Sequence, residues 1–64
     1  MNTKIRELRT DRGMSQEQLA EKSEVSRTVI SQLENDTREV VTSDTMLKIA
    51  RALDCTIAEV FLLD

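Results

Sequence analysis

Four polar residues between positions 27 and 32 have the side chains best suited to chemistry in this sequence: Arg27, Thr28, Ser31 and Gln32. Arginine can bond to both acceptors of guanine, glutamine can match the donor and acceptor of adenine, and threonine offers a hydroxyl and a methyl group that suit thymine. Such residues also lie at the exposed surface of almost any protein, and composition alone favours that simpler interpretation. The choice depends on the elements that carry these residues.

The composition argues against catalysis and metal binding. The 64 residues include one glycine, Gly13, one cysteine, Cys55, and no histidine, so neither a zinc site nor a glycine-rich phosphate loop can be assembled. We find no constellation of acid, base and nucleophile, and therefore expect no enzyme and no cofactor. We also expect no small-molecule ligand, because this length leaves no room for a second, sensing domain. Cys55 is expected to be a small buried contact.

Length and charge limit the partners. We expect a single domain over residues 1–64 with a small core. No apolar run approaches the ~20 residues of a membrane-spanning helix, and the N-terminus MNTKIREL lacks the apolar stretch of a secretory signal. A cytoplasmic protein with no membrane contact is expected. The formal net charge of −3 opposes a nucleic-acid partner, although a small domain can turn one basic face toward DNA.

The spacing of apolar residues predicts an all-α fold. The chain has no proline, and its apolar residues recur every three or four positions, which is typical of amphipathic helices. Five helices are predicted, over about 3–13, 16–22, 27–34, 43–53 and 57–63. Gly13 is expected to end the first helix. Capping residues predict where the others begin: Ser15 with Gln18, Ser26, Thr42 or Ser43, and Thr56 with Glu59.

The apolar residues predict one small core and a surplus at the end of the chain. The residues expected to face inward are Ile5, Leu8, Leu19, Ala20, Val25, Ile30, Leu33, Met46, Leu47, Ala50 and Leu53. Residues 35–43 are rich in turn-forming side chains and predict a loop, with Val40 and Val41 packing back onto the core. The last helix has more large apolar residues than one inward stripe can bury. A contact with a second copy of the chain is therefore predicted for Phe61, Leu62 and Leu63, with the loop around Val40 as a second candidate.

Residues 16–35 have the pattern of two short helices joined by a tight turn over 23–25, with Ala20 small enough to let the helices approach closely. A helix-turn-helix has this pattern, and its second helix reads the DNA major groove. The stretch SQEQLAEKSEVSRTVISQLEND resembles the helix-turn-helix of the phage Cro and repressor family, also called the XRE type. IRELRTDRGM before it and TMLKIARALDCTIAEVF after it are similar to the first helix and the last two helices of that family.

The resemblance implies a compact five-helix, repressor-like DNA-binding domain. It implies a sequence-specific transcriptional regulator, in particular a repressor that binds an inverted-repeat operator in double-stranded DNA as a homodimer. It implies base contacts by Arg27, Thr28, Gln32 and Ser31. It implies phosphate contacts by Gln16, Asn35 and Ser26. It also implies a partly buried ion pair between Arg9 and Glu34.

Three positions depart from the pattern of the family. Glu24 and Asp36 stand where the family usually has glycine, so each must adopt a positive φ or shift its turn. Ser23 stands where the family usually has an apolar residue, which weakens the hold of the second helix on the core. The competing interpretation is a protein-interaction module of the same fold, such as an antitoxin or antirepressor, with weak or no specific DNA binding.

Overall fold

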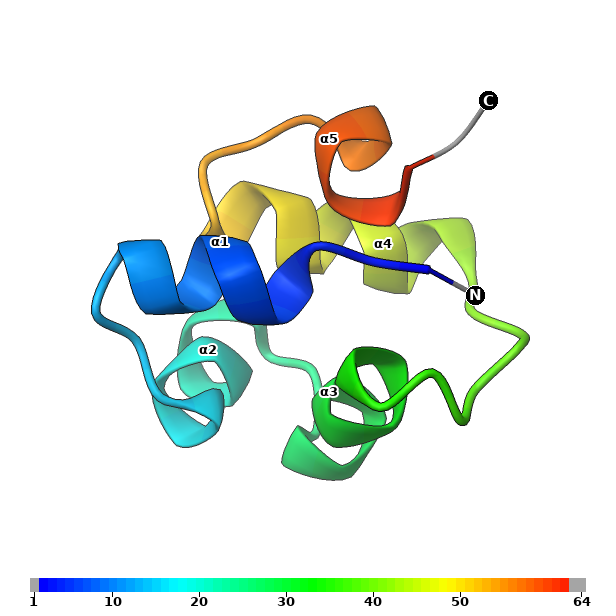
Figure 1. Cartoon of the computed structure of the whole chain (residues 1–64), viewed down its shortest axis with the longest axis horizontal. Helices are drawn as coiled ribbons and strands as arrows, with labels where there is room; N and C mark the ends of the chain where they lie inside the picture. Colours follow the sequence, from blue (N-terminus) through cyan, green and yellow to red (C-terminus); the bar gives the residue numbers. More distant parts are fainter. Residues whose placement is uncertain (1, 63–64) are drawn as a thin grey trace.

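The structure, a computed structural model, describes residues 2–62. Five helices lie within this range. In chain order they are α1 (Ile5–Asp11), α2 (Gln16–Ser23), α3 (Arg27–Glu34), α4 (Ser43–Ala52) and α5 (Ile57–Phe61). No strand occurs over residues 2–62, and the predicted all-α fold is confirmed. Figure 1 shows α2 and α3 at one side of the molecule, α5 at the opposite side, and α1 crossing between them. α4 packs against both α2 and α5.

Side-chain hydrogen bonds fix where four of the helices begin. The capping boxes predicted at Ser15 and Thr56 are both present, each with a reciprocal pair of bonds between the cap and the residue three positions later. Ser26 and Thr42 each accept a hydrogen bond from the backbone N–H three residues later. Thr42 rather than Ser43 therefore caps α4. Because these bonds join residues only three positions apart, the sequence predicts where the helices begin.

The first and last helices are shorter than predicted. α1 begins at Ile5 rather than near Thr3, and Lys4 at the cap position makes no capping bond through its side chain. It ends at Asp11, and Gly13, with φ of 66°, then turns the chain toward α2. α5 ends at Phe61 because the next residue adopts a left-handed conformation. The predicted extension of this helix to Leu63 reaches beyond the described residues.

The core lies where all five helices meet. Its buried apolar residues are Ile5, Leu19, Val25, Ile30, Leu33, Ile49, Ala50, Ala52, Leu53, Val60 and Phe61. α1 and α5, the first and last helices, both contribute to this core. They are also joined by a hydrogen bond of 2.7 Å from the Lys4 N–H to the Val60 carbonyl. Cys55 is half-buried and packs against the same cluster.

Three expectations about apolar side chains need correction. Val40 is 78% exposed and does not pack onto the core, whereas its neighbour Val41 does. Leu47 is exposed, because α4 turns Ile49 inward in its place. Phe61 is only 2% exposed and belongs to the core of its own chain, so it does not lie on a surface that a second copy could contact.

The structure accommodates each departure from the family pattern by a local conformation or hydrogen bond. Glu24 and Asp36 both adopt the positive φ that glycine would take, at 61° and 58°. Ser23 is buried, and its hydroxyl accepts a hydrogen bond of 3.3 Å from the Val25 N–H in the following turn. A buried polar group is costly only when it lacks a partner. The turn between α2 and α3 is therefore kept without glycine.

Candidate nucleic-acid interface

α3 presents a polar face away from the core. Ile30 and Leu33 on its inner side are buried, while Arg27 and Thr28 on its first turn are exposed and Ser31 and Gln32 on its second turn are half-buried. These four residues line one shallow hollow together with Gln16, the first residue of α2. The structure thus brings the four candidate base readers together on one surface, beside the start of the preceding helix.

Arg27 has an acidic neighbour at this surface. Its Nη1 lies 3.5 Å from Oε1 of Glu17, and the two side chains are 61% and 76% exposed. An ion pair so open to water contributes under about 1 kcal/mol. The guanidinium of Arg27 therefore leaves Glu17 at little cost when a stronger acceptor approaches.

Glu34, at the end of α3, is the centre of a buried hydrogen-bond cluster. Its side chain is 0% exposed, and that of Arg9 on α1 is 12% exposed. Nε of Arg9 donates to Oε2 of Glu34 at 2.9 Å and its Nη2 donates to Oε1 at 3.0 Å. The third nitrogen of Arg9 donates to the Met14 carbonyl at 2.8 Å. This geometry is the bidentate pairing that fixes an arginine against a carboxylate.

Two further residues donate to the same carboxylate. Nε of Arg6 lies 3.1 Å from Oε1 of Glu34, and Nε2 of Gln16 lies 3.3 Å from it. Burial by itself raises the pKa of Glu34, but the hydrogen bonds from Arg9, Arg6 and Gln16 outweigh burial and hold that pKa below its ordinary value. The hydrogen bond to Glu34 raises the pKa of Arg9, and burial opposes this rise. Both groups are thus charged at neutral pH.

The cluster also holds two of the three candidate phosphate-contacting residues, Gln16 and Asn35. The side chain of Gln16 is tied to Glu34 by one N–H. Oδ1 of Asn35 accepts from Nη2 of Arg6 at 3.1 Å, and its Nδ2 donates to the Ser31 hydroxyl at 3.4 Å. Ser26 is exposed and uses its hydroxyl as the cap of α3. Gln16 and Asn35 flank α3 with their side-chain positions fixed.

Sequence reasoning missed Arg6 and Arg38. Both lie outside the helix-turn-helix segment, so no pattern within residues 16–35 pointed to them. Nη1 of Arg38 donates to Oε1 of Gln32 at 2.6 Å. Three arginines are therefore joined to the end of α3 through Glu34, Asn35 and Gln32.

A family model for helix-turn-helix proteins matches residues 5–60 of the chain. The chain belongs to the helix-turn-helix family. The high-resolution crystal structure of the restriction-modification controller protein C.AhdI from Aeromonas hydrophila is similar, with a TM-score of 0.80 and 41% sequence identity. That match covers 88% of this chain and 83% of the other. No curated protein sequence matches the chain.

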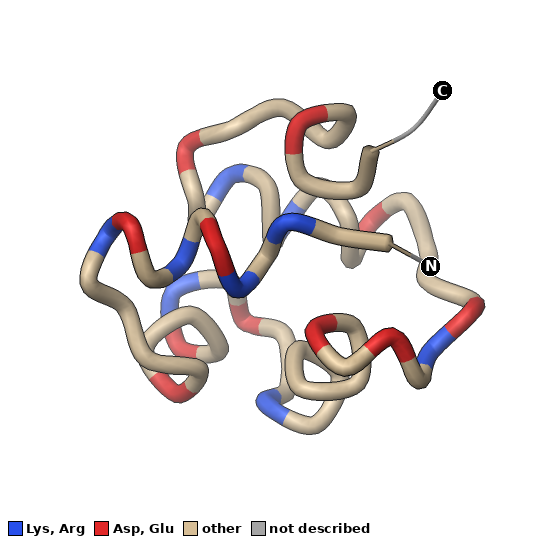
Figure 2. Tube along the Cα trace, in the orientation of Figure 1, with Lys and Arg blue, Asp and Glu red and all other residues tan. Residues whose placement is uncertain are grey.

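Membership confirms the resemblance to the Cro and repressor family that the motif indicated. This helix-turn-helix protein is a DNA-binding transcriptional regulator. α2 and α3 are the two helices of its motif, and the polar hollow lies on their outer side. In Figure 2, charged positions of both signs are mixed along the chain, while α3 is uncharged between its two ends. Arg27 is therefore the one charged residue on the candidate reading face.

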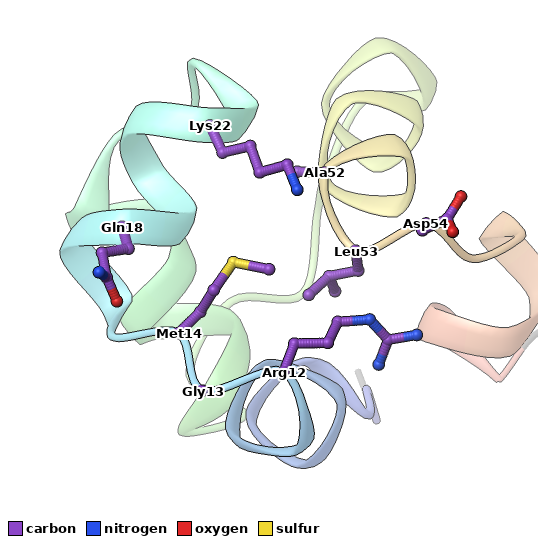
Figure 3. A pocket seen from close by; sticks show the side chains of 8 residues that line it. All are labelled: Arg12, Gly13, Met14, Gln18, Lys22, Ala52, Leu53 and Asp54. Atoms are coloured by element: carbon purple, nitrogen blue, oxygen red, sulfur yellow. The ribbon is translucent and has the colours of Figure 1, made fainter.

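A second hollow of the regulator lies away from α3. It is lined by residues of α2, the end of α4 and the turn after α1: Arg12, Gly13, Met14, Gln18, Lys22, Ala52, Leu53 and Asp54. Figure 3 shows Met14 and Leu53 between the side chains of Arg12 and Lys22. Because no residue of α3 lines it, this hollow is separate from the candidate interface. No helix within residues 2–62 is long and apolar enough to cross a membrane.

Proposed function

We propose that this regulator is a repressor that binds an inverted-repeat operator as a homodimer, with α3 of each copy in the major groove. The observation that carries the proposal is the polar face of α3, where Arg27, Thr28, Ser31 and Gln32 line one hollow open to solvent. These side chains have the donors and acceptors that distinguish base pairs in the major groove. A regulator of this kind acts where the DNA is, which in a bacterium is the cytoplasm.

Contacts to phosphate would fix the register of α3 on the duplex. Gln16 stands at the first turn of α2, where backbone N–H groups point outward and favour an anion. Ser26 and Asn35 stand at the two ends of α3. Because Gln16 and Asn35 are held by the cluster around Glu34, their positions relative to α3 do not depend on the DNA. We assign these three residues to positioning rather than to base recognition.

The dimer contact is assigned to the end of the chain. Leu62 follows α5 and is 43% exposed, although it is large and apolar. Leu63, the other apolar residue expected there, lies outside the described residues. Two copies related by a two-fold axis would present two reading helices to two half-sites. Each copy then needs only one short helix to read its half-site.

The role in the cell is proposed from the solved neighbour. That protein is named as a restriction-modification controller. A regulator with the same fold and 41% identity to it is suited to a comparable task, so we propose that this chain controls the expression of such a system. The exposed readers on α3, rather than the fold, would set which operator it recognises.

Selection of bound duplexes from a random DNA library tests the proposal. One enriched inverted repeat is expected. On that duplex Arg27→Ala should weaken binding by roughly 1–3 kcal/mol and relax preference at one base pair per half-site. Gln16→Ala should weaken binding to every duplex alike.

Arg51→Ala is the matched control, because Arg51 is an exposed arginine on α4 that does not line the polar hollow. It should leave base preference unchanged. A protein that enriches no sequence, or an Arg27→Ala variant that loses affinity equally on selected and scrambled duplexes, would contradict the proposal. The protein-interaction module would then be the better interpretation.

A further inference from the structure

The loop after α3 holds Gln32 by both its backbone and its side chain. The N–H of Thr37 donates to the carbonyl of Gln32 at 2.9 Å, and the hydroxyl of Thr37 donates to the same oxygen at 3.2 Å. Arg38 donates from Nη1 to Oε1 of the Gln32 side chain at 2.6 Å. The loop can return to α3 because Asp36 reverses the chain with φ of 58°.

Arg38 is itself fixed in place. Its Nε donates to the carbonyl of Val40 at 3.1 Å, so the guanidinium bridges the loop and the reading helix. The bond between Arg38 and Gln32 is partly buried. A charged donor with a second anchor holds an amide more firmly than a neutral surface contact does.

The chemistry of arginine determines which end of the amide it faces. A guanidinium has only donors, whereas a glutamine amide has an accepting oxygen and a donating NH2 group. Rotating the amide by half a turn would place two donors against each other. Oε1 of Gln32 must therefore face Arg38, and the Nε2 group is left to meet a ligand.

This orientation changes what Gln32 can recognise. Bidentate pairing of glutamine with adenine needs Oε1 to accept from the adenine amino group while Nε2 donates to N7. Because the bond to the guanidinium occupies one lone pair of Oε1 and turns this oxygen toward Arg38, Gln32 presents chiefly the two N–H donors of Nε2 to a ligand. Guanine presents two acceptors, O6 and N7, and no donor at its major-groove edge, so it suits such a side chain.

We propose that Arg38 is a positioning residue that sets the base preference of Gln32, making it read guanine rather than adenine. The inference rests on the proposed function, since it requires that α3 lies in the major groove. It goes beyond that proposal by naming the base and the residue that selects it.

The test is the random-duplex selection repeated with three further variants. Gln32→Ala identifies the base pair that Gln32 reads, because preference is lost there. At that pair the unaltered protein should favour guanine over adenine roughly tenfold. Arg38→Met frees the amide, so preference should fall below about twofold or shift to adenine. Arg51→Met removes one arginine elsewhere on the surface and should keep the guanine preference.

The experiment measures base preference at one base pair. A general loss of charge or stability lowers affinity for all duplexes but does not change this preference. Far-ultraviolet circular dichroism verifies that each variant is folded. The inference is overturned if Arg38→Met keeps the guanine preference or if the unaltered protein prefers adenine. It is also overturned if Gln32→Ala changes base preference at no position of the enriched inverted repeat. If the unaltered protein enriches no sequence, the proposed function fails and this inference fails with it.

Discussion

Glu34 joins the two helices of the motif to α1. Its carboxylate accepts from Arg9 and Arg6 on α1 and from Gln16 on α2, while it is itself the last residue of α3. A fully buried carboxylate is tolerable only when such partners replace water. The relative placement of α3 and the first turn of α2 therefore depends on this one charge.

The stability that Glu34 provides should depend on pH. Its folded-state pKa lies below the ordinary value of about 4.5, so its contribution is complete above that value and is lost as the pH falls through the folded pKa. Glu34→Gln should destabilise the protein by about 2 kcal/mol near neutral pH. The difference between the two proteins should shrink from about pH 5 downward. Urea unfolding across this range measures it.

Glu21→Gln is the control for this titration, because Glu21 is an exposed glutamate on α2. It should leave the free energy of unfolding within about 0.5 kcal/mol of that of the unaltered protein. A Glu34→Gln variant that stays equally destabilised at all pH values would mean that the carboxylate remains charged throughout, or that the substitution acts only through packing.

The sequence predicted the pairing of Arg9 with Glu34 only through resemblance, and it did not predict Arg6 or Arg38. Arg6 reaches Glu34 from 28 positions away. Arg38 reaches Gln32 through a loop whose path depends on the positive φ of Asp36. Neither contact has a periodicity or a local motif, so tertiary placement alone creates it.

At the scale of the helices, predictions succeeded where the deciding bonds are local. Both capping boxes join residues three positions apart, so they are visible in the sequence. In α4 the prediction failed because the helix has more apolar residues, including Leu47 and Ile49, than one of its faces can bury. Packing against α2 and α5 selects Ile49 and leaves Leu47 exposed.

The left-handed residue after α2 offers a test of backbone strain. Glu24 has φ of 61°, a conformation that costs a residue with a Cβ atom about 1–2 kcal/mol. Glu24→Gly removes this strain but makes the unfolded chain more flexible. A net gain of roughly 0.5–1 kcal/mol in the free energy of unfolding is expected, measured by urea denaturation.

Glu21→Gly provides the contrast inside the same helix. Glu21 has ordinary helical surroundings, so glycine there should reduce the free energy of unfolding by about 1 kcal/mol. If both substitutions destabilised the protein equally, the conformation at Glu24 would carry no strain worth relieving.

At the scale of the whole molecule, the proposed homodimer contact after α5 can be tested. Leu62→Lys places a charge on the exposed apolar residue after α5 and should convert the proposed homodimer into a monomer. Sedimentation equilibrium at micromolar concentrations measures the change. Folding should be unaffected, because Leu62 lies outside the core.

Val40→Lys tests the second candidate surface, the loop before α4, where Val40 is 78% exposed. It should leave the oligomeric state unchanged. A protein that sediments as a monomer before any substitution, or a Leu62→Lys variant that still forms dimers, would move the interface elsewhere.

The meeting of α1 and α5 in the core has a consequence for protein synthesis. Ile5 is synthesised well before Phe61, yet both are buried in the same cluster, and the Lys4 N–H donates to the Val60 carbonyl. A nascent chain that lacks α5 leaves this cluster open to water. α3 is therefore firmly supported by this cluster only after α5 has been synthesised, so a product truncated before α5 should fold less stably.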